Sequence, residues 1–167
     1  MSSVIKVDQI QLADGSTPTA ADLGLNTSGS ILQVVQTVVS AQQATTSTSW
    51  IDATGLSLNI TPSSVNNKIL VIASLETGGG ASGTNNTTRY RVVRDGTTVM
   101  GMQSLRTYDY GSSGVYITSS TVITNLDSPN TVSQITYKVQ LIFVAGSNAY
   151  INSENGTSTL TVMEIAG

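Results

Sequence analysis

The chain consists of short runs in which apolar and polar residues alternate, and clusters of Gly, Asn, Asp, Ser or Pro separate these runs. A period of two is typical of a strand that buries one face. Leu56–Thr61 alternates strictly and ends at Pro62. Asp95-Gly96 separates two such runs and is the strongest short hairpin signal. No amphipathic helical pattern interrupts the series, so the sequence predicts an all-β protein.

The runs give about eight strands, and an antiparallel β-sandwich of two sheets, of jelly-roll type, is the expected fold. The strand-like runs cover residues 31–39, 50–51, 56–61, 68–76, 89–94, 97–103, 115–126, 134–144, 149–151 and 158–165, of which 50–51 and 149–151 are only two and three residues long. Ser40–Ser49 reads as a polar connection, and the Gly-rich stretch Gly78–Asn86 and residues Arg106–Gly114 read as loops.

Two of the expected strands are apolar on both faces. Lys68–Glu76 places Ile69 and Val71 on one face and Leu70 and Ile72 on the other. The run Gln134–Val144 is also apolar on one face and partly apolar on the other. Such strands need a second cover besides their own core, and we expect one side to be buried between subunits.

The N-terminal region reads as an arm, residues 1–29, attached to a sandwich domain, residues 30–167. Its strand pattern Val4–Leu12 is followed by turn and linker residues with one helical turn at most, Thr19–Gly24. The tether Gln11–Gly29 could span up to ~60 Å at ~3.3 Å per residue. We expect the arm to pair with a sheet edge on a neighbouring chain. The candidate attachment residues are Val4, Ile5, Val7, Ile10 and Leu12.

Catalytic chemistry has little support in this sequence. The chain has no Cys and no His, which excludes disulfides and thiolate metal sites and removes the commonest general base. The ten acidic residues form no close motif. Asp95 and Asp127 occur in turn sequences, where Asp makes local hydrogen bonds. We therefore expect no enzyme, no catalytic residue, no cofactor and no metal site.

The acidic balance and the hydropathy exclude two further partners. A formal net charge of −3 argues against nucleic-acid binding, which needs clustered Lys and Arg. The best apolar run, Val139–Ala145, is too short for a membrane helix, and the first twelve residues lack a signal-peptide pattern. These features predict a soluble chain, made in a cytoplasm, that does not insert into membranes.

Three features are left as candidates for binding or pairing. The stretch Tyr108-Asp109-Tyr110 suits a sugar or a protein contact, although its tyrosines could equally pack on the sandwich. Alternation places Arg89 and Arg91 on one sheet face and Arg94 on the other. Either group could be a solvated face or an inter-subunit contact with acids such as Glu76 or Glu164. Glu164 alternates with Leu160 and Val162, so it is expected to point inward to a structural partner, or to a neighbouring subunit.

Several segments resemble a β-domain of phage structural proteins, especially those of cyanophages and other marine phages. The resemblance is carried by Gly29–Gln36, Trp50–Ser64, Lys68–Val71, Arg94–Thr97 and Ser158–Ile165, and by the starting segment Ile5–Ile10. It implies a virion surface component with a jelly roll like that of tumour-necrosis-factor-type proteins, often a homotrimer, and it brings no functional residue list.

From the resemblance and the compact, shaft-free chain, we expect a capsid decoration, cement or head-fibre protein that is attached by its arm. A short tail fibre or receptor-binding knob is the alternative, with residues 108–110 as its contact. A polysaccharide-degrading tailspike enzyme lacks paired acids at readable spacing. The expected partners are further copies of the chain, other phage structural proteins such as the major capsid or tail protein, and, for the knob, a host surface glycan.

Overall fold

The computed structural model describes residues 9–19, 22–24, 28–81, 85–108 and 115–167. The described chain is folded into strands and one short 3₁₀ turn. The elements are β1 (Ile31–Val39), β2 (Gln43–Thr45), β3 (Ile51–Ile60), β4 (Lys68–Ala81), β5 (Asn86–Arg94), β6 (Thr98–Thr107), β7 (Val115–Asp127), β8 (Ile135–Ala145), β9 (Asn148–Ile151), η1 (Ser153–Asn155) and β10 (Ser158–Ile165).

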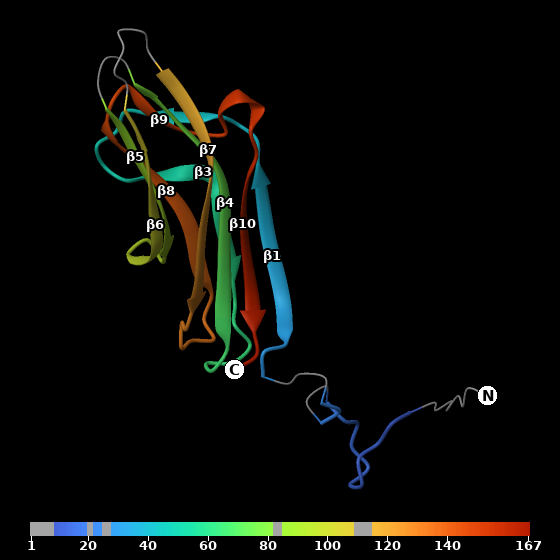
Figure 1. Cartoon of the computed structure of the whole chain (residues 1–167). Helices are drawn as coiled ribbons and strands as arrows, with labels where there is room; N and C mark the ends of the chain where they lie inside the picture. The colour runs from blue at the N-terminus through green and yellow to red at the C-terminus, as the bar shows by residue number, and fades with distance from the viewer. Residues whose placement is uncertain (1–8, 20–21, 25–27, 82–84, 109–114) are drawn as a thin grey trace, which may run out of the picture.

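The strands form two antiparallel sheets that pack face to face (Figure 1). In sheet A, β4 pairs with β7 on one edge, while β10 and then β9 pair with successive parts of its other edge. β1 pairs with the outer edge of β10, and β2 pairs with the outer edge of β9. Sheet B has the order β3-β8-β5-β6. This arrangement is the jelly-roll sandwich that the sequence predicts.

The strand pairs are nested around one turn. β1 pairs with β10, β3 with β8, β4 with β7 and β5 with β6, so the chain behaves as one long hairpin wrapped into a sandwich. At the centre, Asp95 (φ 48°) and Gly96 (φ 77°) have positive φ, and the Thr97 N–H donates to the Arg94 carbonyl at 3.2 Å. The predicted Asp-Gly turn is therefore the pivot of the whole fold.

The core lies between the sheets and is mainly aliphatic. Sheet A contributes the inward residues of β4 and β10, and sheet B contributes those of β3, β5 and β8. The largest fully buried apolar members are Tyr90, Tyr137, Leu56, Ile69, Leu75, Leu141, Ile151, Leu160, Val71 and Val92. Alternation along each strand places every second residue in this layer, as the sequence pattern predicts.

The prediction that Gly78–Asn86 forms a loop is wrong for its first half. β4 continues through Gly78–Gly80 and pairs there with β7 and β9. Glycine is needed because neighbouring side chains approach the backbone closely. A Cβ on Gly79 would lie 2.9 Å from Cγ of Asn86, and a Cβ on Gly78 would lie 3.0 Å from Oγ of Ser153.

Three other expected boundaries differ from the structure. The polar connection at residues 40–49 contains β2, which pairs with β9. Trp50-Ile51 and Leu56–Thr61 are not separate strands, because β3 is continuous and absorbs a register shift between Asp52 and Ser57, with Gly55 at φ 82°. β6 extends through Thr107 into the predicted 106–114 loop. Cross-strand pairing explains each extension, and a local pattern cannot show it.

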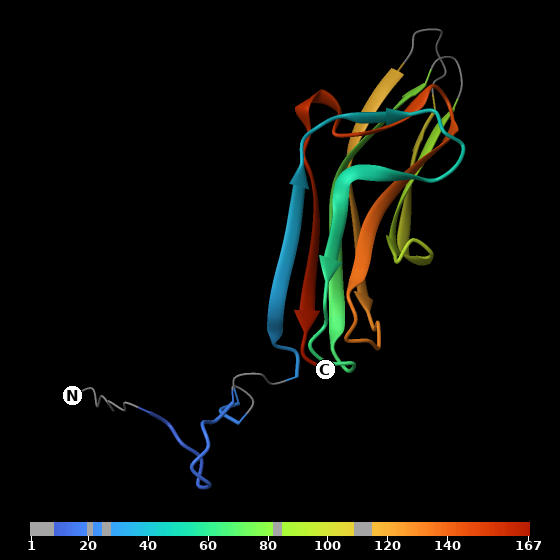
Figure 2. The same cartoon turned by 180° about the vertical axis from the view of Figure 1, so that it is seen from behind.

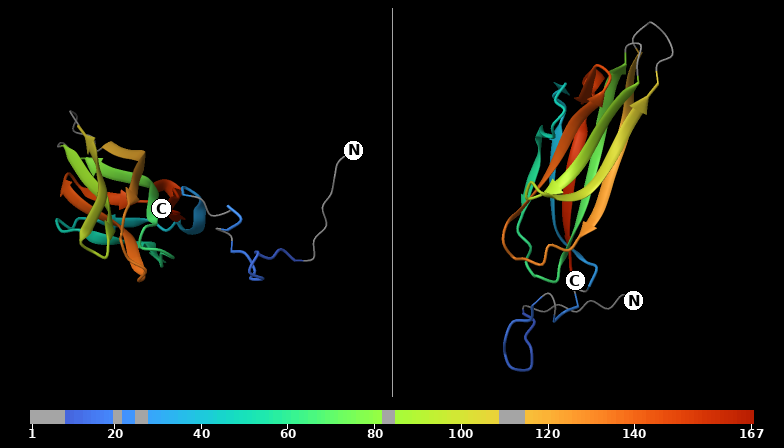
Figure 3. Two further views of the ribbon diagram at one scale, coloured as in Figure 1. Left: turned by 90° about the horizontal axis from the view of Figure 1, so that it is seen from below. Right: turned by 90° about the vertical axis from the view of Figure 1, so that its left-hand side faces the viewer.

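The arm meets the sandwich at the end where β10 finishes. The Gly29 N–H donates to the Ala166 carbonyl at 2.8 Å, and the Ala166 N–H donates to the Ser30 carbonyl at 2.9 Å. From there the preceding residues lead away from the sandwich (Figures 1 and 2). Views from below and from the side show the two layers and the arm beyond their lower end (Figure 3). The β6 end at Thr107 lies at the opposite end of the sandwich.

Candidate interaction surfaces

The outward face of sheet A is apolar across four strands. Register places Val34, Met163, Leu70 and Leu126 side by side in one row. The outer members, Val34 and Leu126, are 55% and 53% exposed, and the two central side chains are half-buried. An exposed apolar row of this kind is unusual on an isolated soluble domain and is typical of an interaction surface.

Neighbouring rows continue this face, and we define the sheet A patch by all of them. The remaining members are Ile31, Ile165 and Lys68 below the first row, and Gln36, Thr161, Ile72, Thr124, Val38, Thr159, Ser74 and Val122 above it. Lys68 is the only charged member of the patch. The sequence expectation that Leu70 and Ile72 face away from the core is confirmed, and both are half-buried. Two such patches could meet face to face with little electrostatic repulsion, because each carries only the one charge of Lys68 at its edge.

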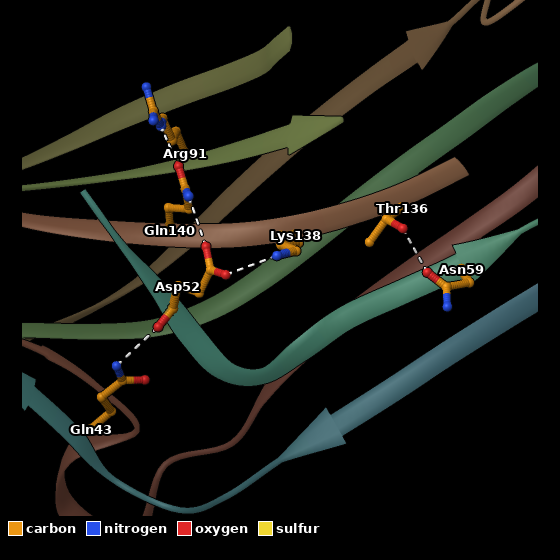
Figure 4. Close-up of polar contacts among 7 residues, drawn as sticks. All are labelled: Gln43, Asp52, Asn59, Arg91, Thr136, Lys138 and Gln140. Carbon is orange, nitrogen blue, oxygen red and sulfur yellow. Dashed lines mark hydrogen bonds and ion pairs between the residues drawn. The ribbon is translucent and has the colours of Figure 1, made fainter. Parts of the chain in front are cut away.

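The outward face of sheet B is polar instead (Figure 4). The Asp52 carboxylate accepts hydrogen bonds from Lys138 at 2.9 Å and from Gln140 at 2.7 Å. Gln140 in turn accepts a bond from Nε of Arg91 at 2.8 Å, and the Arg91 guanidinium lies 4.1 Å from the centroid of the Trp50 ring. Hydrogen bonds from Gln140 and Lys138 hold the pKa of Asp52 below its ordinary value. The result is an ordered ladder of side chains across β3, β8 and β5.

Arg94, for which a solvated position and an inter-subunit contact were both open, has its partner within its own chain. Arg94 contacts neither Glu76 nor Glu164, but forms a salt bridge of 2.6 Å with Asp127. Tyr137 donates a hydrogen bond of 2.6 Å to the same carboxylate oxygen. Asp127 is therefore the end of β7 and part of an internal polar cluster, rather than a residue that makes local turn bonds. Asp95 does act in its turn, where Oδ1 accepts the Thr136 N–H at 2.9 Å.

Glu164 points inward, as predicted, but none of its described partners is an arginine. Its exposed fraction is 1%, and its carboxylate accepts four hydrogen bonds from neutral groups. Oε1 accepts from the Ser63 N–H, the Ser63 hydroxyl and the Asn67 amide at 2.6, 2.9 and 2.6 Å, and Oε2 accepts from Gln33 at 2.6 Å. Burial would raise the pKa of Glu164, but these bonds outweigh it and lower the pKa.

These contacts make Glu164 a structural clamp at the base of the arm. They join β1, β10 and the β3–β4 loop within a few residues of Gly29, where the arm begins. Gln33 reinforces the junction by donating a second bond to the Thr61 carbonyl at 2.9 Å. The clamp has no free acid–base group, because every described contact of the carboxylate is a hydrogen bond it accepts. Its position indicates that it fixes the point from which the arm leaves the domain.

Five attachment residues were predicted in the arm. Val4, Ile5 and Val7 lie outside the described residues. Ile10 and Leu12 are described, and their side chains are 51% and 38% exposed. Gln9–Leu12 forms no strand in the single chain. At the expected helical turn, Thr19 and Asp22 cap each other reciprocally, and residues 20–21 between them lie outside the described residues. Exposed apolar side chains on a polar tether are what a docking segment requires, and its partner stays a prediction.

The predicted recognition loop is described only at its start. Tyr108 follows β6 and is 57% exposed, while Asp109 and Tyr110 lie outside the described residues. Its exposed ring does not pack on the sandwich core. Arg89 and Arg91 share the outward face of sheet B, as alternation predicts. Glu164 is buried in its own chain, which excludes its carboxylate as their contact on another subunit.

The described part of the chain shows no constellation of an active site. Within it, no group of three or more acidic, Cys or His side chains could hold a metal ion. Across the same residues there is no ligand-sized cavity. No helix of the described residues is long and apolar enough to cross a membrane. The candidate interaction surfaces are the two sheet faces, the arm and the end of β6.

These features define the class of the molecule: an antiparallel jelly-roll sandwich with one apolar and one polar sheet face. No protein-family model and no curated protein matches the chain. Among solved structures it is similar to the infectious bursal disease virus VP2 subviral particle, with TM-score 0.39 and 13% identity over 98% of this chain. It is also similar to the infectious bursal disease virus Gx strain structure, with TM-score 0.36 and 11% identity over 81% of this chain.

The chain spans 38% and 32% of the lengths of these two structures. At this level of identity the likeness concerns the fold only. The function proposed below therefore rests on the residues of this chain.

Proposed function

We propose that this protein is a non-enzymatic structural component of a phage virion. In this proposal it is an oligomeric capsid decoration, cement or head-fibre protein that is attached by its N-terminal arm. The observation that carries the proposal is the apolar row Val34, Met163, Leu70 and Leu126, which spans sheet A on its outward side. An exposed apolar sheet face is stabilised when another protein surface covers it.

A second copy of the chain is the occupant that best fits the sheet A patch. The patch carries a single charge, on Lys68 at its lower edge, so two patches can approach with little electrostatic cost. Two of the outer strands of sheet A, β1 and β7, are long, and neither contains Lys or Pro, the residues that commonly block association at a sheet edge. We therefore assign the patch to a homo-oligomer, and propose a trimer.

We assign attachment to the particle to the arm. It diverges from the domain at Gly29, and it exposes Ile10, Leu12 and Leu23. The Glu164 clamp holds the base of the arm against β1, β10 and the β3–β4 loop, so the arm leaves the domain from one fixed point. Backbone pairing with an open sheet edge of another virion protein would order the segment that is extended here.

Deletion of residues 1–29 tests this assignment. The truncated protein should keep its fold and its oligomeric mass, because the clamp and the sheet A patch remain, but it should no longer join particles. Copy number per particle then separates the roles: a decoration protein needs hundreds of copies, and a tail tip needs a few to a few dozen. Normal incorporation of the truncated protein would exclude attachment by the arm.

A receptor-binding knob on a short tail fibre is the second candidate. It is favoured by the exposed ring of Tyr108, which follows β6 at the end of the sandwich opposite the arm. Tyr108→Ala should then reduce adsorption of particles to host cells without changing thermal stability. Unchanged adsorption would remove Tyr108 as a contact and leave the decoration role as the better proposal.

A further inference from the structure

Three arginines on the outward face of sheet B form no salt bridge with a carboxylate among the residues that the structure describes. The described salt bridges join Arg94 to Asp127 and Lys138 to Asp52. Arg89, Arg91 and Arg106 take part in neither. Arg89 and Arg91 alternate along β5, and Arg106 lies opposite Thr87 in the adjacent β6, so all three lie on the same side of the sheet. We call this group the arginine face.

The arginine face is positive within a chain of net charge −3. With Lys138 on β8, four cations lie on the outward side of sheet B. Asp52 on β3 is the single carboxylate among the strand residues on that side. The acids that the sequence offered as partners are held elsewhere: Glu164 is buried in its clamp, and Glu76 lies on sheet A, where Ser153 bonds to its carboxylate. The face therefore has an unmatched positive potential that favours an anionic partner.

One side chain of this face, Arg91, is held in place before any partner binds. Arg91 stacks on Trp50 at 4.1 Å, and Gln140 fixes its Nε at 2.8 Å (Figure 4). This leaves the two terminal nitrogens of Arg91 without a described bond. Arg89 has a buried Nε with no hydrogen-bond partner. Guanidinium groups that are ordered but incompletely bonded are suited to carboxylate, sulfate or phosphate oxygens.

We infer that the arginine face binds an anionic polysaccharide. A polymer fits better than a small ligand, because the described surface is a sheet without a cavity. Arg89 and Arg91 are two residues apart on one strand, which separates them by about 6–7 Å. Such spacing allows several charges along one chain to bind together. The planar groups of Trp50 and Gln140 beside them offer stacking and hydrogen bonds to sugar rings.

The inference is independent of the oligomer, because the arginine face and the sheet A patch lie on opposite sides of the sandwich (Figure 1). Self-association through sheet A leaves sheet B outward. In the assembled particle, many copies would present this face together, and avidity would strengthen weak single contacts. Failure of this inference would leave the structural role untouched, since incorporation into particles tests the arm.

The test uses the full chain and four immobilised probes: polygalacturonate, dextran sulfate, neutral dextran and poly-glutamate. We expect binding to at least one of the two anionic polysaccharides, no binding to dextran, and weakening at higher salt. The double variant Arg89→Gln/Arg91→Gln should bind on the order of ten-fold more weakly or worse. Asn130→Asp/Asn155→Asp is the matched control, because it lowers the net charge by the same two units at exposed turn positions outside both sheets, and its affinity should stay unchanged.

Arg106→Gln provides a second variant on the exposed edge strand β6, should the double variant fail to fold, and it too should weaken binding. Binding to neither anionic polysaccharide would overturn the inference. So would equal losses for Asn130→Asp/Asn155→Asp and Arg89→Gln/Arg91→Gln, since binding would then follow net charge only. Binding to poly-glutamate without binding to the polysaccharides would also overturn it, and would assign the face to an acidic protein.

Discussion

The amide of Asn67 donates a 2.6 Å hydrogen bond to the carboxylate of Glu164, and both side chains are buried. The bond joins the β3–β4 loop to β10, which are 97 residues apart in sequence. Because the carboxylate receives all its described bonds from neutral donors, it keeps its charge without a cation. This clamp, the apolar patch on sheet A and the glycines of β4 lead to separate predictions.

Glu164→Gln should destabilise the domain by about 1–3 kcal/mol, because an amide nitrogen would face the buried donors of Ser63 and Asn67. Urea unfolding at neutral pH measures the change. Glu154→Gln, at an exposed position, is the control and should have no effect beyond about 0.5 kcal/mol. Equal stability of Glu164→Gln and the native protein would show that the clamp contributes nothing.

The lowered pKa of Glu164 predicts an acid-dependent loss of stability. The ordinary value is 4.5, and the folded value lies below it. The stabilisation is fully present above the ordinary value and is lost as the pH falls through the folded value. The gap in unfolding free energy between the native protein and Glu164→Gln should therefore narrow on acidification. A gap that is constant from about pH 6 to about pH 3 would contradict this linkage.

Leu126→Lys should weaken self-association on the order of 100-fold or more, because it places a charge within a covered apolar surface. Its exposed position in the single chain means that the fold itself should persist. Analytical ultracentrifugation across a concentration series measures the change. Val99→Lys, at an equally exposed apolar position on β6, is the matched control. An unchanged mass for Leu126→Lys would place the interface elsewhere.

Gly79→Ala should cost about 1–3 kcal/mol, because its methyl group would press against the Asn86 side chain, which is itself buried. Gly80→Ala should cost less, since its nearest neighbour is the Asn148 side chain at 3.3 Å. Thermal unfolding of the two variants compares them directly. If both lose the same stability, backbone entropy rather than close packing explains the glycines of β4.

The pKa of Tyr90 is raised to about 12, mainly by burial. Because the unfolded value is 10.0, stability is fully present below that pH and is lost as the pH rises toward the folded value. Tyr90→Phe should unfold with a flatter dependence between about pH 9 and about pH 11. It should also be less stable at neutral pH, since the hydroxyl bonds to Tyr150 and Gly78 carbonyls are lost. Tyr108→Phe, at an exposed position, should match the native profile.

Much of the fold could be predicted from local patterns. Alternation assigned Ile69 and Val71 inward and Leu70 and Ile72 outward, because side chains along a strand alternate whatever the strand pairs with. Asp95-Gly96 located the central turn for a similar reason, since positive φ at both positions is a property of those two residues. Both features depend on neighbours within a few residues.

The candidate surfaces were only partly predictable. The sequence indicated a covered second face, but pairing decided that Val34, Met163, Leu70 and Leu126 form one row. The arginines shared a face by alternation, whereas their lack of carboxylate partners became visible only with the tertiary contacts. The aromatic and acidic residues 108–110 marked Tyr108 as a candidate contact, and the structure showed that its ring is exposed.

The sequence by itself determined the all-β class, the jelly-roll type, the arm and the direction of most strand side chains, because these follow from residue type and short-range spacing. Only the tertiary structure decided that Gly78–Gly80 continues a strand, that Asp127 pairs with Arg94, and that neutral groups clamp Glu164. Each of these contacts joins segments that are far apart in the chain. Nested strand pairing brings them together, and no local pattern encodes that register.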